Sequence, residues 1–129
     1  MNYKGTIIKE SLKDTSILEE VKILDTKIEK VTEKHKTPWL KQWTIISIEV
    51  NADKAAKISK RLSECMESSH DFYADFKNEN IHFIIFKNKI FRVDITSKSQ
   101  YDEVKKYALS LGLPEYQVDF HPDIKNWER

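Results

Sequence analysis

The stretch FYADFKNENIHFIIFKNKIFRVD, residues 72–94, contains three alternating apolar runs separated by two short polar turns. The runs cover residues 72–76, 81–86 and 89–94, and the polar residues 77–80 and 87–88 lie between them. Asparagine tolerates a positive φ, so both turns can be tight without a glycine. The stretch therefore predicts three antiparallel strands joined by hairpins.

The turns also predict which residues face each other across the hairpins. If Asn78–Glu79 is the first turn, Asp75 lies opposite His82, and if Lys87–Asn88 is the second, His82 lies opposite Val93. Alternation then divides the side chains between two apolar faces, and a one-residue error would exchange the partnerships. One face carries Tyr73, Asp75, His82, Ile84, Phe86, Phe91 and Val93, and the other carries Phe72, Ala74, Phe76, Ile81, Phe83, Ile85, Ile90, Arg92 and Asp94.

Two long helices flank these strands. Apolar residues recur with a helical period near residues 52–67 and 98–112. Ser97 and Gln100 fit a capping box at the start of the second helix, and Gly112 and Pro114 end it. The apolar stripes consist of Ala55, Ile58, Leu62, Cys65 and Met66 in the first helix and of Tyr101, Val104, Ala108 and Leu111 in the second.

Further strands are predicted on both sides of this region. Alternating residues predict strands over 6–10, 43–50 and 116–120. Over residues 21–28 the alternation slips by one position, which indicates a bulged strand. Thr37–Pro38 has the pattern of a helix start, with the proline at the first helical position.

These elements predict an α+β fold with a largely antiparallel sheet and both long helices on one face. The order from residue 43 onward is close to a ferredoxin-like split βαβ arrangement with extra N-terminal strands. We expect one domain over 1–129, in which residues 1–36 form a strand extension, 37–120 the core and 121–129 a tail.

Both faces of the central strands are apolar, although two helices on one side can cover only one of them. The second face must then be covered by the N-terminal strands, by a second subunit or by a ligand. This coverage argument predicts a two-fold homodimer, with coverage by residues 1–36 as the alternative.

Composition excludes several classes of function. The chain has 22 basic and 21 acidic side chains, so no global charge favours nucleic acid or an anionic membrane. The single Cys65 excludes an intrachain disulfide, and two glycines give little scope for a phosphate-binding loop. No apolar run is long enough to span a membrane and no signal peptide is evident, so we expect a cytoplasmic protein.

The candidate site combines an acid–base pair with aromatic residues. A carboxylate at Asp75 beside the imidazole of His82 could support general acid–base chemistry or could simply be a structural pair. Trp39 and Trp43 are four residues apart and could line a ligand pocket with His35 and Tyr73, or could fill one end of the core.

Three other groups carry weaker signals. Asp119, His121 and Asp123 alternate as metal ligands could, but alternation near a terminus is weak evidence, so no metal and no other cofactor is expected. A stripe of Lys54, Lys57 and Arg61 could meet phosphates, but it has the character of a solvated helix face. Cys65, on an apolar stripe, has the character of a small buried hydrophobe.

Three segments resemble a family of short, uncharacterised prokaryotic proteins. They are Thr37–Trp43, Tyr73–Asn78 and Pro114–Phe120, and the similarity extends over most of the chain. No activity is known for that family, so the resemblance implies no catalytic residues.

The sequence thus predicts a small binding or interaction module, partnered by a second copy, a small molecule or another protein and without catalysis of its own. A small enzyme that uses Asp75 and His82 is the alternative, and nucleic-acid binding through the lysine-rich helix is a weaker one.

Overall fold

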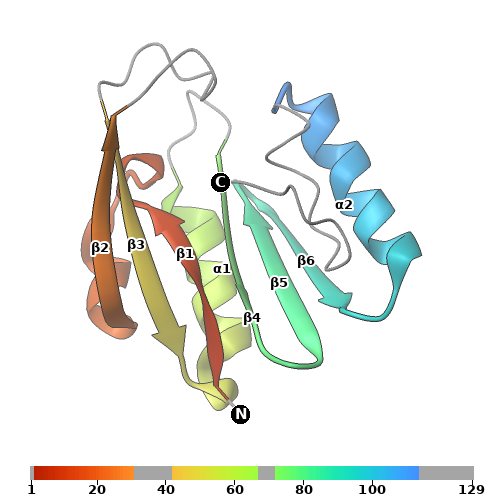
Figure 1. The fold of residues 1–129 in the computed structure, drawn as a ribbon, viewed down its shortest axis with the longest axis horizontal. Coiled ribbons are helices and arrows are strands. Elements are labelled where there is room, and N and C mark those ends of the chain that lie inside the picture. The colour runs from red at the N-terminus through yellow and green to blue at the C-terminus, as the bar shows by residue number, and fades with distance from the viewer. Residues whose placement is uncertain (1, 31–41, 67–71, 114–129) are drawn as a thin grey trace.

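A computed structural model describes residues 2–30, 42–66 and 72–113 of the chain (Figure 1). Its centre is a six-stranded sheet in which every pair of neighbouring strands is antiparallel. The strands are β1 (Tyr3–Ile8), β2 (Lys22–Lys30), β3 (Gln42–Val50), β4 (Tyr73–Lys77), β5 (Ile81–Phe86) and β6 (Lys89–Asp94). Their order across the sheet is β2-β3-β1-β4-β5-β6.

Two α-helices and three short 3-10 helices complete the described part of the chain. The α-helices are α1 (Ala55–Cys65) and α2 (Lys98–Ser110), and the 3-10 helices are η1 (Lys9–Ser11), η2 (Thr15–Glu20) and η4 (Ala52–Lys54). Both α-helices lie within the ranges where long helices are predicted, and η4 occupies the first turn expected for α1. The predicted helix start at Thr37–Pro38 and the predicted strand over 116–120 lie outside the described residues.

β1 lies in the middle of the sheet and pairs with β3 on one side and with β4 on the other. The N-terminal region, in which strands are predicted, thus supplies a central strand of the sheet. Since β3 and β4 both run antiparallel to β1, they are parallel to each other, and β3-α1-β4 is a split βαβ unit with β1 in its gap.

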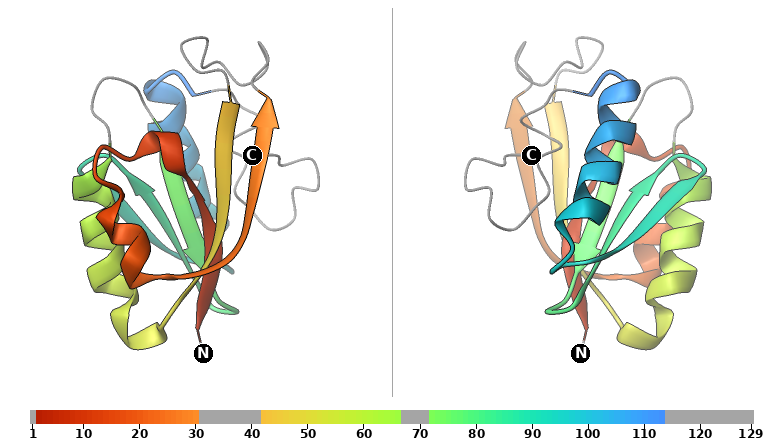
Figure 2. Two further views of the ribbon diagram at one scale, coloured as in Figure 1. Left: turned by 90° about the vertical axis from the view of Figure 1, so that its left-hand side faces the viewer. Right: turned by 90° about the vertical axis from the view of Figure 1, so that its right-hand side faces the viewer.

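The two α-helices lie on opposite faces of the sheet, which corrects the expectation that both cover one face (Figure 2). A ferredoxin-like arrangement has its helices on the same face, so the fold departs from it in this respect. The short turn after β6, Ile95–Ser97, leads α2 onto the face opposite α1. The physical reason is that the face with Tyr73 and Ile84 is as apolar as the other and needs a cover.

Each helix packs its apolar stripe on one core. On the α1 side, Ile58 and Leu62 pack with strand residues such as Ile48 and Phe76. The smaller α2 core combines four strand residues with three helix residues, which are Tyr73, Ile84, Phe86, Val93, Tyr101, Val104 and Ala108. The face that motivated the predicted homodimer is thus covered within the chain, and the coverage argument does not support a dimer through it.

The bulge predicted in the second strand is confirmed. The register between β2 and β3 shifts between Ile23 and Asp25, which leaves Leu24 as the extra residue. β2 is the outermost strand on its side of the sheet, as β6 is on the other (Figure 1).

Candidate functional site

Asp75, His82 and Tyr101 form a buried polar cluster between the sheet and α2. His82 Nε2 lies 2.7 Å from Asp75 Oδ2, and His82 Nδ1 lies 2.9 Å from the hydroxyl oxygen of Tyr101. β4 supplies the carboxylate, β5 the imidazole and α2 the phenol. The predicted contact between Asp75 and His82 is therefore present, with a third partner that sequence analysis placed only on an apolar stripe.

The register of the first hairpin differs from the predicted one by two residues. His82 lies opposite Lys77, and Asp75 lies opposite Ile84, so the predicted direct pairing is wrong. Because a shift of two residues preserves the alternation, Asp75 and His82 still share a face and meet diagonally.

The side chain of Asn78 accounts for this register. Its Oδ1 accepts hydrogen bonds from the backbone N–H groups of Asn80 and Ile81, at 2.8 Å each. Its own N–H donates to the carbonyl oxygen of Ile81. Asn78 and Ile81 therefore close the hairpin, and the two-residue turn is Glu79–Asn80, one position later than predicted. The second turn, at Lys87–Asn88, is confirmed: Asn88 has a φ of 59°, and His82 pairs with Val93.

The cluster is shielded from solvent. The side chain of His82 is fully buried and Asp75 is almost so. Burial raises the pKa of Tyr101 to about 12, and the nearby carboxylates of Asp75 and Asp94 add to the shift. The phenol is therefore protonated at neutral pH.

Both ring nitrogens of His82 have a partner within the cluster. Nδ1 lies against the hydroxyl of Tyr101, and Nε2 lies against the carboxylate of Asp75. Both ring nitrogens are then engaged, so neither is available to exchange a proton with a bound substrate. In this arrangement the cluster binds α2 to the sheet by satisfying polar groups that would otherwise be buried alone.

The two described members of the predicted aromatic pocket lie on different strands of the sheet. Trp43 and Tyr73 are both buried, but they lie on β3 and β4, with β1 between them. Tyr73 packs instead against Phe86, with ring centroids 6.1 Å apart. His35 and Trp39 lie outside the described residues.

A shallow pocket of about 230 Å³ lies elsewhere, where α1 meets the turn between β5 and β6. The contacts beside it are structural: Ser63 Oγ donates to the carbonyl oxygen of Phe86, and the N–H of Asn88 donates to the carbonyl oxygen of Ser63. The lining residues are Lys60, Ser63, Glu64, Asn88, Lys89 and Ile90. None of them belongs to the predicted site.

The weaker candidates gain no support as ligand sites. The described residues contain no group of three side chains suited to a metal ion, and the candidates Asp119, His121 and Asp123 lie outside them. Arg61, part of the basic stripe, forms an ion pair with Glu20 of η2. Burial raises the pKa of the Cys65 thiol, which disfavours the nucleophilic thiolate.

The edge strand β2 exposes a concentration of apolar side chains that sequence analysis did not single out. In the described part of the chain, three of the four exposed large hydrophobic side chains lie on β2: Ile23, Leu24 and Ile28, at 47%, 44% and 63% exposure. The bulge that was predicted in this strand is the signal that could have found them, since it places Ile23 and Ile28 on the same face despite their odd spacing.

Comparisons of the chain with protein-family models, with curated proteins and with solved structures found no match. None of the helices in the described ranges has the length and apolar character needed to cross a lipid bilayer.

Proposed function

We propose that this protein is a small interaction module without catalysis of its own, and that its binding surface is the outer edge of β2. The observation that carries the proposal is the group of exposed Ile23, Leu24 and Ile28 on an edge strand. Long edge strands with exposed apolar residues are unusual unless something pairs with them.

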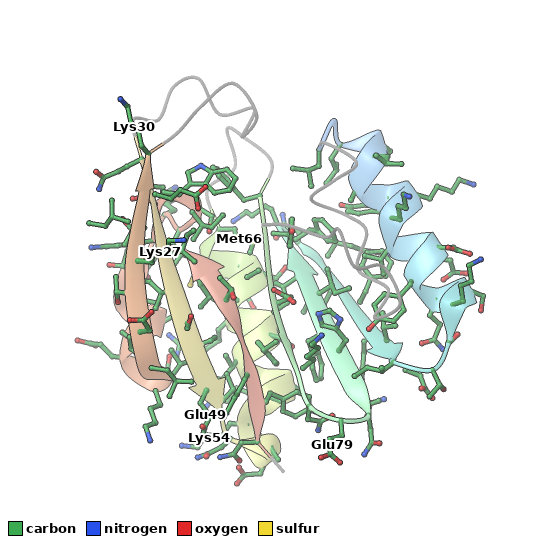
Figure 3. The ribbon with its side chains drawn as sticks, viewed as in Figure 1. Lys27, Lys30, Glu49, Lys54, Met66 and Glu79 are labelled. Atoms are coloured by element: carbon green, nitrogen blue, oxygen red, sulfur yellow. The ribbon has the colours of Figure 1, made fainter. Side chains whose placement is uncertain are left out.

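The mode of binding that fits this edge is strand addition. β2 pairs with β3 on its inner side, and its outer side faces away from the other strands of the sheet (Figure 3). An extended segment of a partner would form backbone hydrogen bonds along the nine residues of β2. Ile23 and Ile28 lie on the same face as Ile48 and Thr44, their partners on β3, and would give the contact its side-chain specificity.

The geometry of the polar cluster favours a binding module over an enzyme. A general base needs access to its substrate, whereas His82 is buried and both its nitrogens are engaged. A replacement His82→Gln is therefore expected to lower the free energy of unfolding by about 2 kcal/mol, because the buried hydrogen bond between the imidazole and Asp75 is lost. The same replacement is expected to leave binding at β2 unchanged, and an unchanged free energy of unfolding would contradict the structural role of His82.

We expect the module to act in the cytoplasm, because its single cysteine rules out the intrachain disulfides that stabilise many small secreted domains.

Photo-crosslinking in cells of the source organism tests the proposed surface. The photoreactive residue p-benzoylphenylalanine replaces Ile28 on β2 or, as the control, Arg92 on the opposite edge strand β6. We expect a covalent adduct with a specific polypeptide at Ile28 and none at Arg92. Absence of an adduct at Ile28, or equal adducts at both edges, would overturn the proposal.

A further inference from the structure

We infer that the partner at β2 is a second copy of this chain, an inference that rests on the proposed function of this edge. Two copies of β2 would pair antiparallel about a two-fold axis passing at Thr26. Such an axis joins the two six-stranded sheets into one and places the same face of both copies on the same side. The pattern of side chains along β2 is complementary to itself in this arrangement.

The charged side chains of β2 support this two-fold register. With Thr26 on the axis, Lys27 lies opposite the partner's Asp25, and the symmetry repeats the pair. Asp25 and Lys27 share a face, because they lie opposite Ser47 and Ile45 on β3. Both are exposed, and neither forms an ion pair with the residues that the structure describes. Opposite charges directly across an antiparallel pair are stabilising.

The bulge at Leu24 brings the exposed apolar side chains of the two copies together. Beyond Asp25, the extra residue Leu24 shifts the alternation by one position. Ile28 of one copy therefore lies against the partner's Leu24 and the partner's Ile23, and Ile23 and Ile28 are on matching faces. The three most exposed apolar side chains of β2 thus meet one another across the axis. The next pair outward brings Lys22 opposite the partner's Glu29, again of opposite charge.

A competing explanation is that the charges and the bulge protect the edge from pairing, as they do in many sheets. Charged side chains protect a sheet edge when they repel a second copy or point into the surface where another strand would pair. On β2 the charges alternate in sign, and Lys27 meets an aspartate in the two-fold register. This pattern attracts a second copy and repels a strand shifted by two residues, which would bring Lys27 opposite the partner's Lys27.

Charge reversal tests the inference. Sedimentation equilibrium of the purified full chain at micromolar concentration is expected to give twice the mass of one chain. Asp25→Lys and Lys27→Glu, each alone, create two like-charge pairs across the axis and are expected to weaken the dimer at least about tenfold. An equimolar mixture of the two variants restores a dimer, because each chain then carries the charges that the other requires, and the double variant D25K/K27E dimerises with itself.

Two controls separate this contact from general effects. Arg92→Glu reverses a charge on the opposite edge strand and is expected to leave the dimer intact. Circular dichroism checks that each variant keeps its fold, which is expected because the altered side chains are exposed.

The outcomes distinguish this inference from the proposed function. A monomeric wild-type chain, or single variants that dimerise as tightly as the wild type, would overturn the homodimer. If the chain is monomeric but the Ile28 crosslinker captures a polypeptide of different mass, the β2 edge binds another protein and only the homodimer is wrong. If the crosslinker captures nothing and the chain is monomeric, both are wrong.

Discussion

Tyr101 shows how one residue can connect a helix to a buried polar pair. Its ring packs in the α2 core, and its hydroxyl lies 2.9 Å from the imidazole of His82, with ring centroids 5.7 Å apart. Without that hydroxyl, Nδ1 of His82 would lose a partner in a site that water does not reach. The cost of an unsatisfied buried group is greater than the net gain from a typical hydrogen bond.

The raised pKa of Tyr101 predicts how its contribution depends on pH. Below pH 10 the phenol is protonated in both folded and unfolded chains, and Tyr101→Phe is expected to be less stable than the wild type by about 1 kcal/mol. As pH rises from the unfolded value of 10.0 toward about 12, only the unfolded chain loses the proton, so the wild type is destabilised relative to the variant.

Urea unfolding at several alkaline pH values measures this effect as the difference between the two proteins. Taking the difference cancels the other tyrosines and the lysines. The wild-type advantage of about 1 kcal/mol should disappear and then reverse, a total change of up to about 2 kcal/mol across the window. A difference that stays constant from pH 9 to 12 would contradict the pKa assigned to Tyr101.

Gly5 is needed because the backbone of β4 approaches it closely. A Cβ at this position would overlap the carbonyl oxygen of Asp75 and the Cα of Phe76. We predict that Gly5→Ala lowers the free energy of unfolding by about 3 kcal/mol, since the central strand pair must separate to make room. Thr6→Ala, at the next position in β1, is the control and should cost less than about 1 kcal/mol. Equal losses in urea unfolding would show that the close approach is unimportant.

At the scale of single elements, the alternation of apolar residues predicts which face each side chain occupies, whereas the register of the first hairpin is predicted wrongly. The faces of β4, β5 and β6 are as predicted, because the period of two survives a shift of two residues. The predicted position of the first turn is wrong because four polar residues, 77–80, lie between the strands and the side chain of Asn78 decides which two form the turn.

The cap of α2 is confirmed in part. Ser97 Oγ accepts a hydrogen bond from the N–H of Gln100, as predicted, but the Gln100 side chain accepts from the N–H of Asp94 instead of returning to Ser97. We predict that Ser97→Ala lowers the free energy of unfolding by about 1 kcal/mol. Ser97→Asp should keep most of that stability, because aspartate is also a good N-cap residue. Thermal unfolding of the two variants measures the difference, and equal melting temperatures would mean that the hydroxyl is not an effective cap.

The candidate site is only partly predictable, because one of its three residues comes from a helix whose position the local sequence pattern does not determine. Asp75 and His82 are near in sequence and share a hairpin, so their contact follows from local pattern. The approach of Tyr101 depends on which face α2 covers, and both faces are apolar enough to accept it. The three turn residues that lead to α2, Ile95–Ser97, are of types that do not specify a direction.

At the scale of the whole molecule, one sheet separates two cores of unequal size. Among the described residues, the α1 core has 15 buried hydrophobic members and the α2 core has seven. An element held by fewer buried contacts can open at a lower free energy than that of global unfolding.

We therefore predict that the amides of α2 exchange with solvent through partial opening, at a lower free energy than those of β1 and β4. Native-state hydrogen exchange resolved by residue measures both. Val104→Ala should lower the opening energy of α2 most, whereas Ile58→Ala in α1 should lower the protection of the central strands as well. Uniform protection across the molecule would indicate a single cooperative unit.

The central place of β1 has a consequence for synthesis on the ribosome. Residues 3–8 are made early, yet their two partners end only at Val50 and Lys77. Until both have emerged, Ile7 and Ile8, which become buried in the finished protein, remain on an extended segment with an open edge. The nascent chain therefore offers chaperones an apolar target until β4 has emerged, and the sheet closes around β1 only after both of its neighbours are available.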